Sequence, residues 1–203
     1  MRRILLLLLP VVVVLGLVAI RLGRATTSRA AAPVTVLRGT EVFPRGMHPA
    51  PAFALRDQTG AVVSTRSLRG QVVAITFLDS HCVLECPVAG RALAATQRLL
   101  GPHSPLHLVV ISVNPAHDTP GSVRTFTREA GITGPWRWLF GTQRRLAPVW
   151  AEYGIQVQPS RGDIVHTPAV YLLDQRGSIR VADAVPFIPS QLAESVRALA
   201  GQR

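Results

Sequence analysis

Hydrophobic residues fall into two patterns along this chain, one long run at the start and several short runs further on. Ile4 to Ile20 form 17 consecutive uncharged and mostly apolar residues. Continuous apolar runs of strand length then occur at residues 71–78, 106–113 and 169–173. Short runs without alternating polar residues are typical of strands buried on both faces of a sheet. The pattern therefore predicts a segment of near-membrane length followed by a domain with a buried central sheet.

Turn and helix patterns lie between these short runs. Residues 53–64 predict a hairpin that turns at Thr59–Gly60, and residues 179–182 complete a second hairpin. The spacing predicts a helix from Cys86 that ends at Gly101–Pro102. Its expected apolar stripe comprises Val88, Ala92, Ala95, Leu99 and Leu100.

Further helices are expected at about residues 121–130, at about 143–153 and from near Ser190. Strands that alternate with helices predict an α/β domain, in which helices cover both faces of the sheet. No internal repeat and no second domain is evident in the sequence.

The first apolar segment predicts a membrane anchor. As a helix, its 17 residues cover about 26 Å, just short of the roughly 30 Å hydrocarbon core of a bilayer. Arg2, Arg3 and Arg21 bracket the segment, and such side chains can reach out to the membrane surface. A cleaved signal peptide is the alternative, with its cleavage site among the small residues 30–32. Both interpretations place the rest of the chain outside the cytoplasm.

The chain is accordingly divided into three parts. Residues 1–24 are the anchor or signal peptide, residues 25–48 are a linker, and residues 49–203 are the folded domain. The linker is rich in Ala, Thr, Arg and Pro, a composition that suits a tether. We expect a single-pass protein of a bacterial cell membrane, with its domain on the extracytoplasmic side.

The number and distribution of charged residues indicate which classes of binding partner suit this chain. The formal net charge is +11, all 22 basic residues are arginine, and the sequence contains no lysine. The arginines are scattered singly or in pairs, without the basic stripe and interleaved aromatic residues that nucleic-acid-binding proteins show. A basic surface is suited instead to an acidic partner protein or to an anionic membrane.

Cys82 and Cys86 are the first candidates for chemistry. As a structural disulfide they would close a very short loop and remove chain entropy worth only about 2 kcal/mol. A domain of this size does not need that constraint, so a working cysteine pair is the stronger interpretation.

The cysteine pair lies where a buried strand passes into a helix. Free backbone N–H groups and the helix dipole at that position stabilise a thiolate, which lowers the pKa of the thiol. Residues four apart on a helix have Cβ atoms about 5–6 Å apart, whereas a disulfide needs about 3.5–4.5 Å. A disulfide therefore needs local unwinding, while two thiolates can flank one metal ion with little change. Soft sulfur ligands select Cu(I) or Zn²⁺.

His166 is the candidate for a third ligand. It stands in Asp163-Ile-Val-His-Thr-Pro168, just before the third core strand. In a thioredoxin-like fold, this loop faces the strand-to-helix turn that carries the cysteines. A lone histidine is usually structural, but its combination with the cysteine pair favours a trigonal Cu(I) site.

Four motifs follow one another in the sequence. They are Phe53-x-Leu-x-Asp-x-x-Gly60, Cys82-x-x-x-Cys86-Pro87, Ser112-Val-x-Pro-x-x-Asp-Thr-Pro120, and His166 before Tyr171-Leu-x-Asp-x-x-Gly177. Together, over residues 50 to about 185, they resemble the Sco/SenC family of copper chaperones. The resemblance implies a thioredoxin-like fold and copper bound through Cys82, Cys86 and His166. It also implies a role in assembling the binuclear copper centre of cytochrome c oxidase, with an oxidase subunit or another copper donor or acceptor as partner.

Two alternatives to a metallochaperone remain open. The first is an enzyme, a thiol–disulfide oxidoreductase that reduces a copper acceptor, in which Cys82 attacks and Cys86 resolves the mixed disulfide. Pro168 favours it, because this position before the strand is that of a proline in redox thioredoxins. The second is a purely structural interaction domain. A peroxiredoxin-type peroxidase is excluded, because its Pro-x-x-x-Thr-x-x-Cys element would require proline and threonine where Ile75 and Asp79 stand.

Other polar residues near the cysteines are secondary candidates. His81 adjoins Cys82 and could tune its thiolate or supply a ligand, and Glu85 is expected as a first-turn carboxylate of the helix. His117 and Asp118 are expected to cap or brace the following helix, and Asn114 stands where the resembled family usually has aspartate. The remaining histidines, His48, His103 and His107, are expected at the surface.

Overall fold

The computed structural model describes residues 36–160 and 163–202, and Thr35–Arg203 form one compact unit. The predicted anchor at residues 1–24 lies outside the described residues, so the anchor and the extracytoplasmic location stay predictions. Within the described ranges, no helix is both long enough and apolar enough to cross a membrane.

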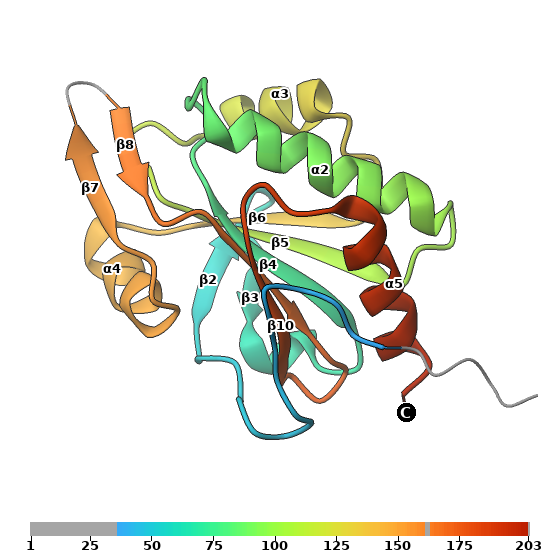
Figure 1. The fold of residues 1–203 in the computed structure, drawn as a ribbon. Coiled ribbons are helices and arrows are strands. Elements are labelled where there is room, and N and C mark those ends of the chain that lie inside the picture. Colours follow the sequence, from blue (N-terminus) through green and yellow to red (C-terminus); the bar gives the residue numbers. More distant parts are fainter. Residues whose placement is uncertain (1–35, 161–162, 203) are drawn as a thin grey trace, which may run out of the picture. The chain divides into compact units, whose positions relative to one another are not determined.

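An eight-stranded mixed sheet forms the centre of this unit (Figure 1). In spatial order its strands are β1 (Glu41–Val42), β10 (Ile179–Ala184), β9 (Ala169–Leu173), β4 (Val72–Leu78), β5 (Leu106–Ser112), β6 (Trp136–Phe140), β2 (Ala54–Asp57) and β3 (Val62–Ser64). β4, β5 and β6 run parallel, and the other neighbouring strands are antiparallel. All seven residues of β4 are buried, as its continuous apolar run requires. Because β4 and β5 are parallel, the loops that follow them meet at one edge of the sheet.

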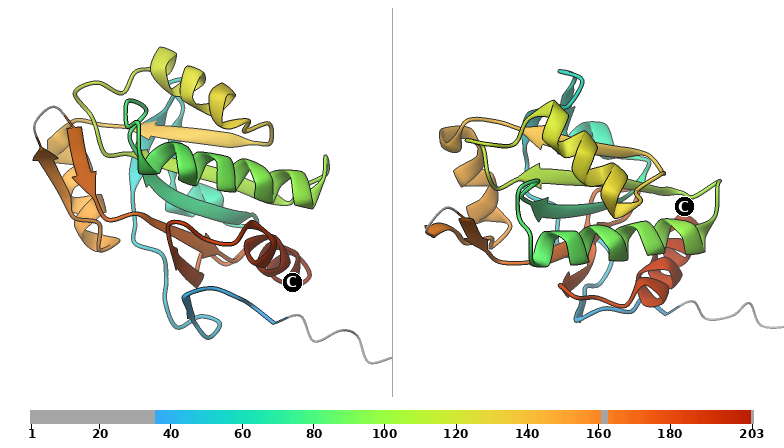
Figure 2. Two further views of the ribbon diagram at one scale, coloured as in Figure 1. Left: turned by 45° about the horizontal axis from the view of Figure 1, so that its top comes forward. Right: turned by 90° about the horizontal axis from the view of Figure 1, so that it is seen from above.

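Helices cover both faces of the sheet. α2 (Glu85–Leu100), α3 (Pro120–Ala130) and α5 (Pro189–Ala200) pack on one face, and α4 (Gln143–Glu152) packs on the other. Figure 2 shows α2 and α3 side by side over the strands. A short 3₁₀ helix, η1 (Thr65–Leu68), follows β3. The predicted α/β sheet with helices on both sides is confirmed.

The start of α3 is fixed by local chemistry. The Thr119 side chain accepts a hydrogen bond from the backbone N–H of Ser122, and the Ser122 hydroxyl caps Thr119 in return. Pro120 occupies the first turn, where its missing N–H costs nothing. Gly131 ends the helix with φ 77°, a left-handed conformation that glycine adopts without strain. These signals hold the loop after β5 to a fixed length and direction.

The buried face of α2 differs from the predicted stripe. Val88 and Leu99 are 39% and 50% exposed. The buried residues of the helix are Cys86, Ala89, Gly90, Leu93, Ala94, Thr96 and Gln97. The predicted stripe is therefore wrong by about one residue, or about 100° around the helix axis. The true orientation places Cys86 on the face that packs against the sheet.

Gly90 permits the close approach of α2 to α3. A Cβ atom at position 90 would lie 2.9 Å from Cβ of Ala130 and 3.1 Å from a ring carbon of Phe126. Real Cβ atoms essentially never come as close as the first of these distances. The two helices are thus as near to each other as a residue without a side chain allows.

Four strands were not predicted. β6 completes the parallel part of the sheet. β7 (Val157–Ser160) and β8 (Asp163–His166) form a separate two-stranded sheet. β1 lies in the segment that was predicted to be a linker, and it pairs with β10. Part of that segment therefore packs on the folded unit.

Candidate metal centre

The two cysteines lie at the junction between β4 and α2. β4 ends at Leu78, and the loop that follows carries Cys82 to the start of α2 at Glu85. Cys82 is half-buried and Cys86, in the first turn of the helix, is 1% exposed. Both are free thiols. Leu84, the residue at the helix N-cap, supplies no side-chain hydrogen bond to the exposed backbone N–H groups.

The sulfur of Cys86 faces two polar groups. The backbone N–H of Asp79 donates a hydrogen bond to Sγ over 3.4 Å, and Nε2 of His166 lies 3.5 Å from Sγ. Burial raises the pKa of the Cys86 thiol, and this effect outweighs the lowering by the Asp79 N–H. The neighbouring Cys82 raises the pKa further. The expectation that the helix start lowers the thiol pKa is therefore wrong for Cys86, because the residue is buried.

The contacts of His166 indicate which ring nitrogen carries the hydrogen. Nδ1 lies 3.1 Å from the backbone carbonyl of Thr167, which can only accept, so Nδ1 carries the hydrogen. Nε2 then presents its lone pair to Cys86. An imidazole held through its other nitrogen is typical of histidines that bind metals.

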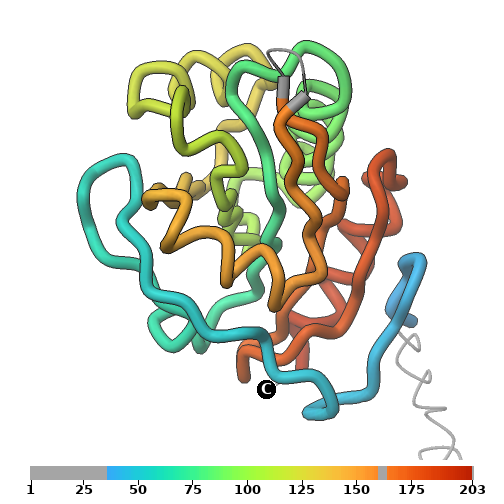
Figure 3. The backbone as a smooth tube through the Cα atoms, turned by 90° about the vertical axis from the view of Figure 1, so that its left-hand side faces the viewer, coloured from blue at the N-terminus to red at the C-terminus, as the bar shows by residue number. Residues whose placement is uncertain are grey.

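The hairpin of β7 and β8 positions His166. Val157 pairs with His166 across the two strands. Directly beyond, the N–H of Thr167 donates to the carbonyl of Gln156 over 3.0 Å, and the N–H of Gln156 donates to the Thr167 hydroxyl over 3.1 Å. Figure 3 shows this hairpin beside the chain that leads from β4 to α2. A small sheet remote in sequence therefore holds the histidine against the cysteine.

The space around the Cys86 sulfur is small and apolar. A cavity of about 10 Å³ lies there, with Phe77, Leu78, Pro168 and Val185 among its walls. A volume of this size is at the lower limit for one water molecule. Pro168 thus lines the site, and the cis peptide bond of the described chain is Val185–Pro186, not the bond before Pro168. A larger opening of about 350 Å³ lies beside Cys82, between α2 and α3.

A chain of polar groups runs behind the cysteine loop. Asp79 is 1% exposed, and its carboxylate accepts from the backbone N–H of His81 over 2.8 Å and from the Asn114 amide over 3.0 Å. The carbonyl oxygen of Asn114 faces Nδ1 of His117 at 3.0 Å. Nε2 of His81 lies 3.0 Å from the backbone carbonyl of His117. The loop after β5 is thereby bound to the cysteine loop.

Asp118 does not cap α3, whose N-cap is Thr119; it binds Ser80 of the cysteine loop, whose hydroxyl also contacts Ser122 in the first turn of α3. Its carboxylate accepts from the N–H and the hydroxyl of Ser80, and from the hydroxyl of Ser112 over 2.5 Å. Burial raises the pKa of Asp118, although these hydrogen bonds oppose the rise. No local sequence signal indicates this role, because it depends on two loops that meet at one edge of the sheet.

No three side chains of the His, Cys, Asp and Glu types already surround one point among the described residues. Cys86 lies 3.5 Å from His166 and also interacts with the neighbouring Cys82. The set of two soft thiol sulfurs and one imidazole nitrogen nevertheless fits copper or zinc chemically. The role of these three residues as ligands stays a prediction.

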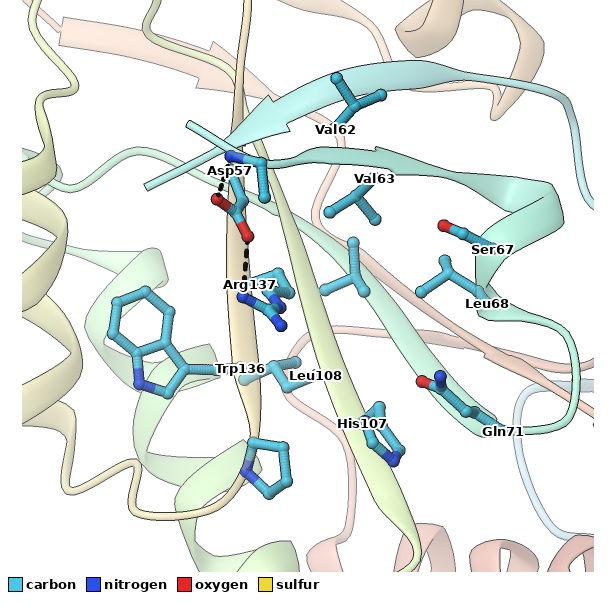
Figure 4. A pocket seen from close by; sticks show the side chains of 13 residues that line it. Asp57, Val62, Val63, Ser67, Leu68, Gln71, His107, Leu108, Trp136 and Arg137 are labelled. Atoms are coloured by element: carbon cyan, nitrogen blue, oxygen red, sulfur yellow. Dashed lines mark hydrogen bonds and ion pairs between the residues drawn. The ribbon is translucent and has the colours of Figure 1, made fainter. Parts of the chain in front are cut away.

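A larger groove lies near the opposite end of β5 (Figure 4). Its volume is about 400 Å³, and Asp57, His107 and Arg137 line it. Arg137 forms an ion pair with the buried Asp57 over 2.8 Å. His107 is half-buried here, in contrast to the predicted surface position.

Comparison with known proteins gives one consistent family. The sequence profile described as SCO1/SenC matches residues 45–201. A Stutzerimonas stutzeri protein whose name refers to copper binding is 29% identical over 142 residues, which cover 64% of this chain and 66% of that protein. The matched region thus spans just under two thirds of that relative.

Solved structures agree with this match. ScoI from Bradyrhizobium japonicum, solved with copper bound, is 25% identical with a TM-score of 0.65, and the alignment covers 74% of this chain and 99% of that one. BsSco is 19% identical with a TM-score of 0.69, covering 80% and 99%. It is described as a member of the Sco family of cytochrome c oxidase assembly proteins with a disulfide switch. These likenesses support the thioredoxin-like α/β fold.

Proposed function

This chain belongs to the SCO1/SenC family, and from that premise we propose that it is an extracytoplasmic copper metallochaperone. It binds one copper ion through Cys82, Cys86 and His166 and passes it on for assembly of the binuclear copper centre of cytochrome c oxidase. The observation that carries the proposal is the approach of His166 Nε2 to within 3.5 Å of the Cys86 sulfur. The two donors come from elements 80 residues apart in sequence.

The chemistry of the donors favours Cu(I). Thiolate sulfur is a soft ligand, and imidazole nitrogen is compatible with copper in both common oxidation states. Metal binding requires the thiol to lose its proton, and the pKa of Cys86 is raised by burial. Copper therefore displaces a proton from Cys86, and copper affinity rises with pH.

The surroundings of the site suit transfer to another protein. Val83 and Leu84, between the cysteines, are 79% and 70% exposed, and Val165, next to His166, is 59% exposed. Exposed apolar side chains around a functional site are typical of a protein-docking surface. The proposed partner is an oxidase subunit or another protein that gives or takes copper.

A thiol–disulfide oxidoreductase is the second candidate function. It is favoured by the unequal exposure of two free thiols, because the half-buried Cys82 can attack a partner disulfide and the buried Cys86 can resolve the product. In that reaction two thiols of this chain become a disulfide while the partner disulfide gains two electrons and two protons.

One experiment separates the two functions. The reduced full-length chain is titrated with Cu(I) against a competing chelator without oxygen, and its rate of disulfide reduction is measured in parallel. We expect one copper ion per chain and a loss of affinity of at least about 10-fold in His166→Ala, because a direct ligand is removed. His103→Ala, an exposed histidine outside the site, is the matched control.

The opposite result assigns the reductase. If His166→Ala binds copper like the parent chain but exchanges thiols much more slowly, the histidine acts on the thiols and not on a metal. Copper retained at full stoichiometry after Cys82 and Cys86 are oxidised to a disulfide would show that the cysteines are not the ligands.

A further inference from the structure

Two further imidazoles lie together at the rim of the cysteine loop. His81 precedes Cys82, and His117 lies in the loop after β5. Both side chains are exposed, and their ring centroids are 6.0 Å apart with the planes inclined at 68°. The loops that carry them are held by the buried Asp79 and Asn114.

The tautomer of His117 is fixed by its neighbours. The Asp79 carboxylate can only accept, so the Asn114 amide nitrogen faces Asp79 and the Asn114 carbonyl oxygen faces His117. That oxygen can only accept as well, so Nδ1 of His117 carries the hydrogen. The lone pair of the ring is then on Nε2.

The tautomer of His81 follows in the same way. Its Nε2 donates to the backbone carbonyl of His117 over 3.0 Å, which leaves the lone pair on Nδ1. None of the described residues hydrogen bonds to Nδ1 of His81 or to Nε2 of His117. Each ring is thus held through one nitrogen by a carbonyl and offers the other nitrogen as a base, the usual arrangement of metal-binding histidines.

The spacing of the rings suits one shared ion. A metal–nitrogen bond of about 2.0–2.1 Å, added to about 1.1 Å from the nitrogen to the ring centre, allows two centroids up to about 6.4 Å apart. The observed 6.0 Å falls within this limit. A shared ion requires the two rings to turn their lone pairs towards one point while each keeps the hydrogen bond that holds its other nitrogen.

We propose that His81 and His117 form a second, exposed copper site, distinct from the site of Cys82, Cys86 and His166. Nitrogen ligands favour Cu(II), and copper is the tightest-bound ion of its series at such a site. No third His, Cys, Asp or Glu side chain joins the pair in the described part of the chain, so water completes the coordination and affinity is lower than at the cysteine site. The site does not depend on the proposed function. If that function holds, copper captured here is one residue from Cys82.

The test removes the three proposed ligands of the cysteine site and measures whether the chain still binds Cu(II). The full-length chain with Cys82→Ser, Cys86→Ser and His166→Ala is titrated with Cu(II) and followed by electron paramagnetic resonance. We expect one bound Cu(II) with hyperfine coupling to two imidazole nitrogens. Adding His81→Gln or His117→Gln should lower affinity at least tenfold, whereas His103→Gln, the exposed control, should leave it unchanged.

A positioning variant tests the same site without removing a ligand. Asn114→Leu removes the carbonyl that orients His117, and we expect affinity to fall by about 10–100-fold with the nitrogen coupling of His117 reduced. Circular dichroism of each variant verifies that the fold is retained. The proposal is wrong if the triple variant binds no Cu(II), or if His81→Gln and His117→Gln both bind it like the triple variant. Cu(I) binding by the unaltered chain, measured separately, tests the proposed function independently.

Discussion

The two ends of β5 carry very different sites. At the carboxyl end, the space beside the Cys86 sulfur is about 10 Å³, and a nitrogen lone pair faces a thiol. Near the amino end, a groove of about 400 Å³ is lined by the ion pair of Asp57 and Arg137. The larger space would be the first guess for a binding site if volume decided.

The two ends of β5 differ in how their polar groups are hydrogen-bonded. The Asp57 carboxylate accepts from the N–H and hydroxyl of Thr59, from the N–H of Ala61 and from Arg137. Burial would raise the pKa of Asp57, but these partners outweigh it and hold the pKa below its usual value. The polar groups at this end bind one another and join β2 to β6, whereas the other end brings the Cys86 sulfur and the His166 imidazole together, the donor types of the proposed copper site. Chemistry, and not volume, locates the site.

The largest expected effect is the loss of copper in Cys86→Ala. Removing the buried sulfur should lower Cu(I) affinity by more than about 1000-fold, equivalent to about 4 kcal/mol, because sulfur supplies most of the affinity for a soft ion. Chelator competition measures the change. Equal affinity in the variant would move the metal site away from this end of the sheet.

In contrast to Cys86→Ala, Asp57→Ala should reduce stability and leave copper affinity unchanged. Four hydrogen-bond donors would lose their acceptor at a side chain that is fully buried, so we expect the free energy of unfolding to fall by about 3 kcal/mol. Copper affinity should stay within twofold of the parent. Urea denaturation and copper competition on the same preparation check both parts, and a large loss of copper affinity would contradict the separation of the two ends.

Arg137→Gln should destabilise the chain less than Asp57→Ala. The guanidinium is half-exposed, so solvent already screens the pair, and we expect a loss of about 1 kcal/mol. Arg144→Gln, an exposed arginine on α4, serves as the control for loss of one surface charge. An equal effect of both variants would show that the ion pair contributes no specific stability.

The smallest effect is a pH dependence at His107. Burial, and then the charge of Arg137, lower the pKa of His107 in the folded chain. The unfolded chain therefore takes up more protons as the pH falls through about 6.5, and stability decreases over that range. His107→Gln should flatten the dependence of the free energy of unfolding on pH between 5 and 7. If the dependence of the free energy of unfolding on pH is unchanged in His107→Gln, groups other than His107 cause it.

The hairpin of β2 and β3, the strands β4, β5, β9 and β10, and the cysteine helix were predictable because their signals are local. The continuous apolar run of β4, the turn at Thr59–Gly60 and the position of Pro87 each act within a few residues. The approach of His166 to Cys86 was predicted from the expected thioredoxin-like fold and not from a local motif. The structure brings these two side chains together.

The rest depends on contacts between distant segments. The hairpin of β7 and β8 is short and half-exposed, so its apolar pattern is weak. The buried face of α2 was misjudged because small residues, which pack closely against α3, count little in a hydrophobic pattern. The raised pKa of Cys86 follows from burial in the assembled fold, which no local motif encodes.

Gly90 links the packing of α2 against α3 to the accessibility of the Cys82 side chain. The opening beside Cys82 lies between α2 and α3, and Phe126 and Ala130 form part of its wall. These are the side chains that a Cβ atom at position 90 would strike. A single methyl group would therefore act as a wedge and alter the width of the opening. In descendants of this sequence, a side chain at position 90 should appear only together with glycine at position 130 and a smaller residue at position 126, so the three positions are expected to change together.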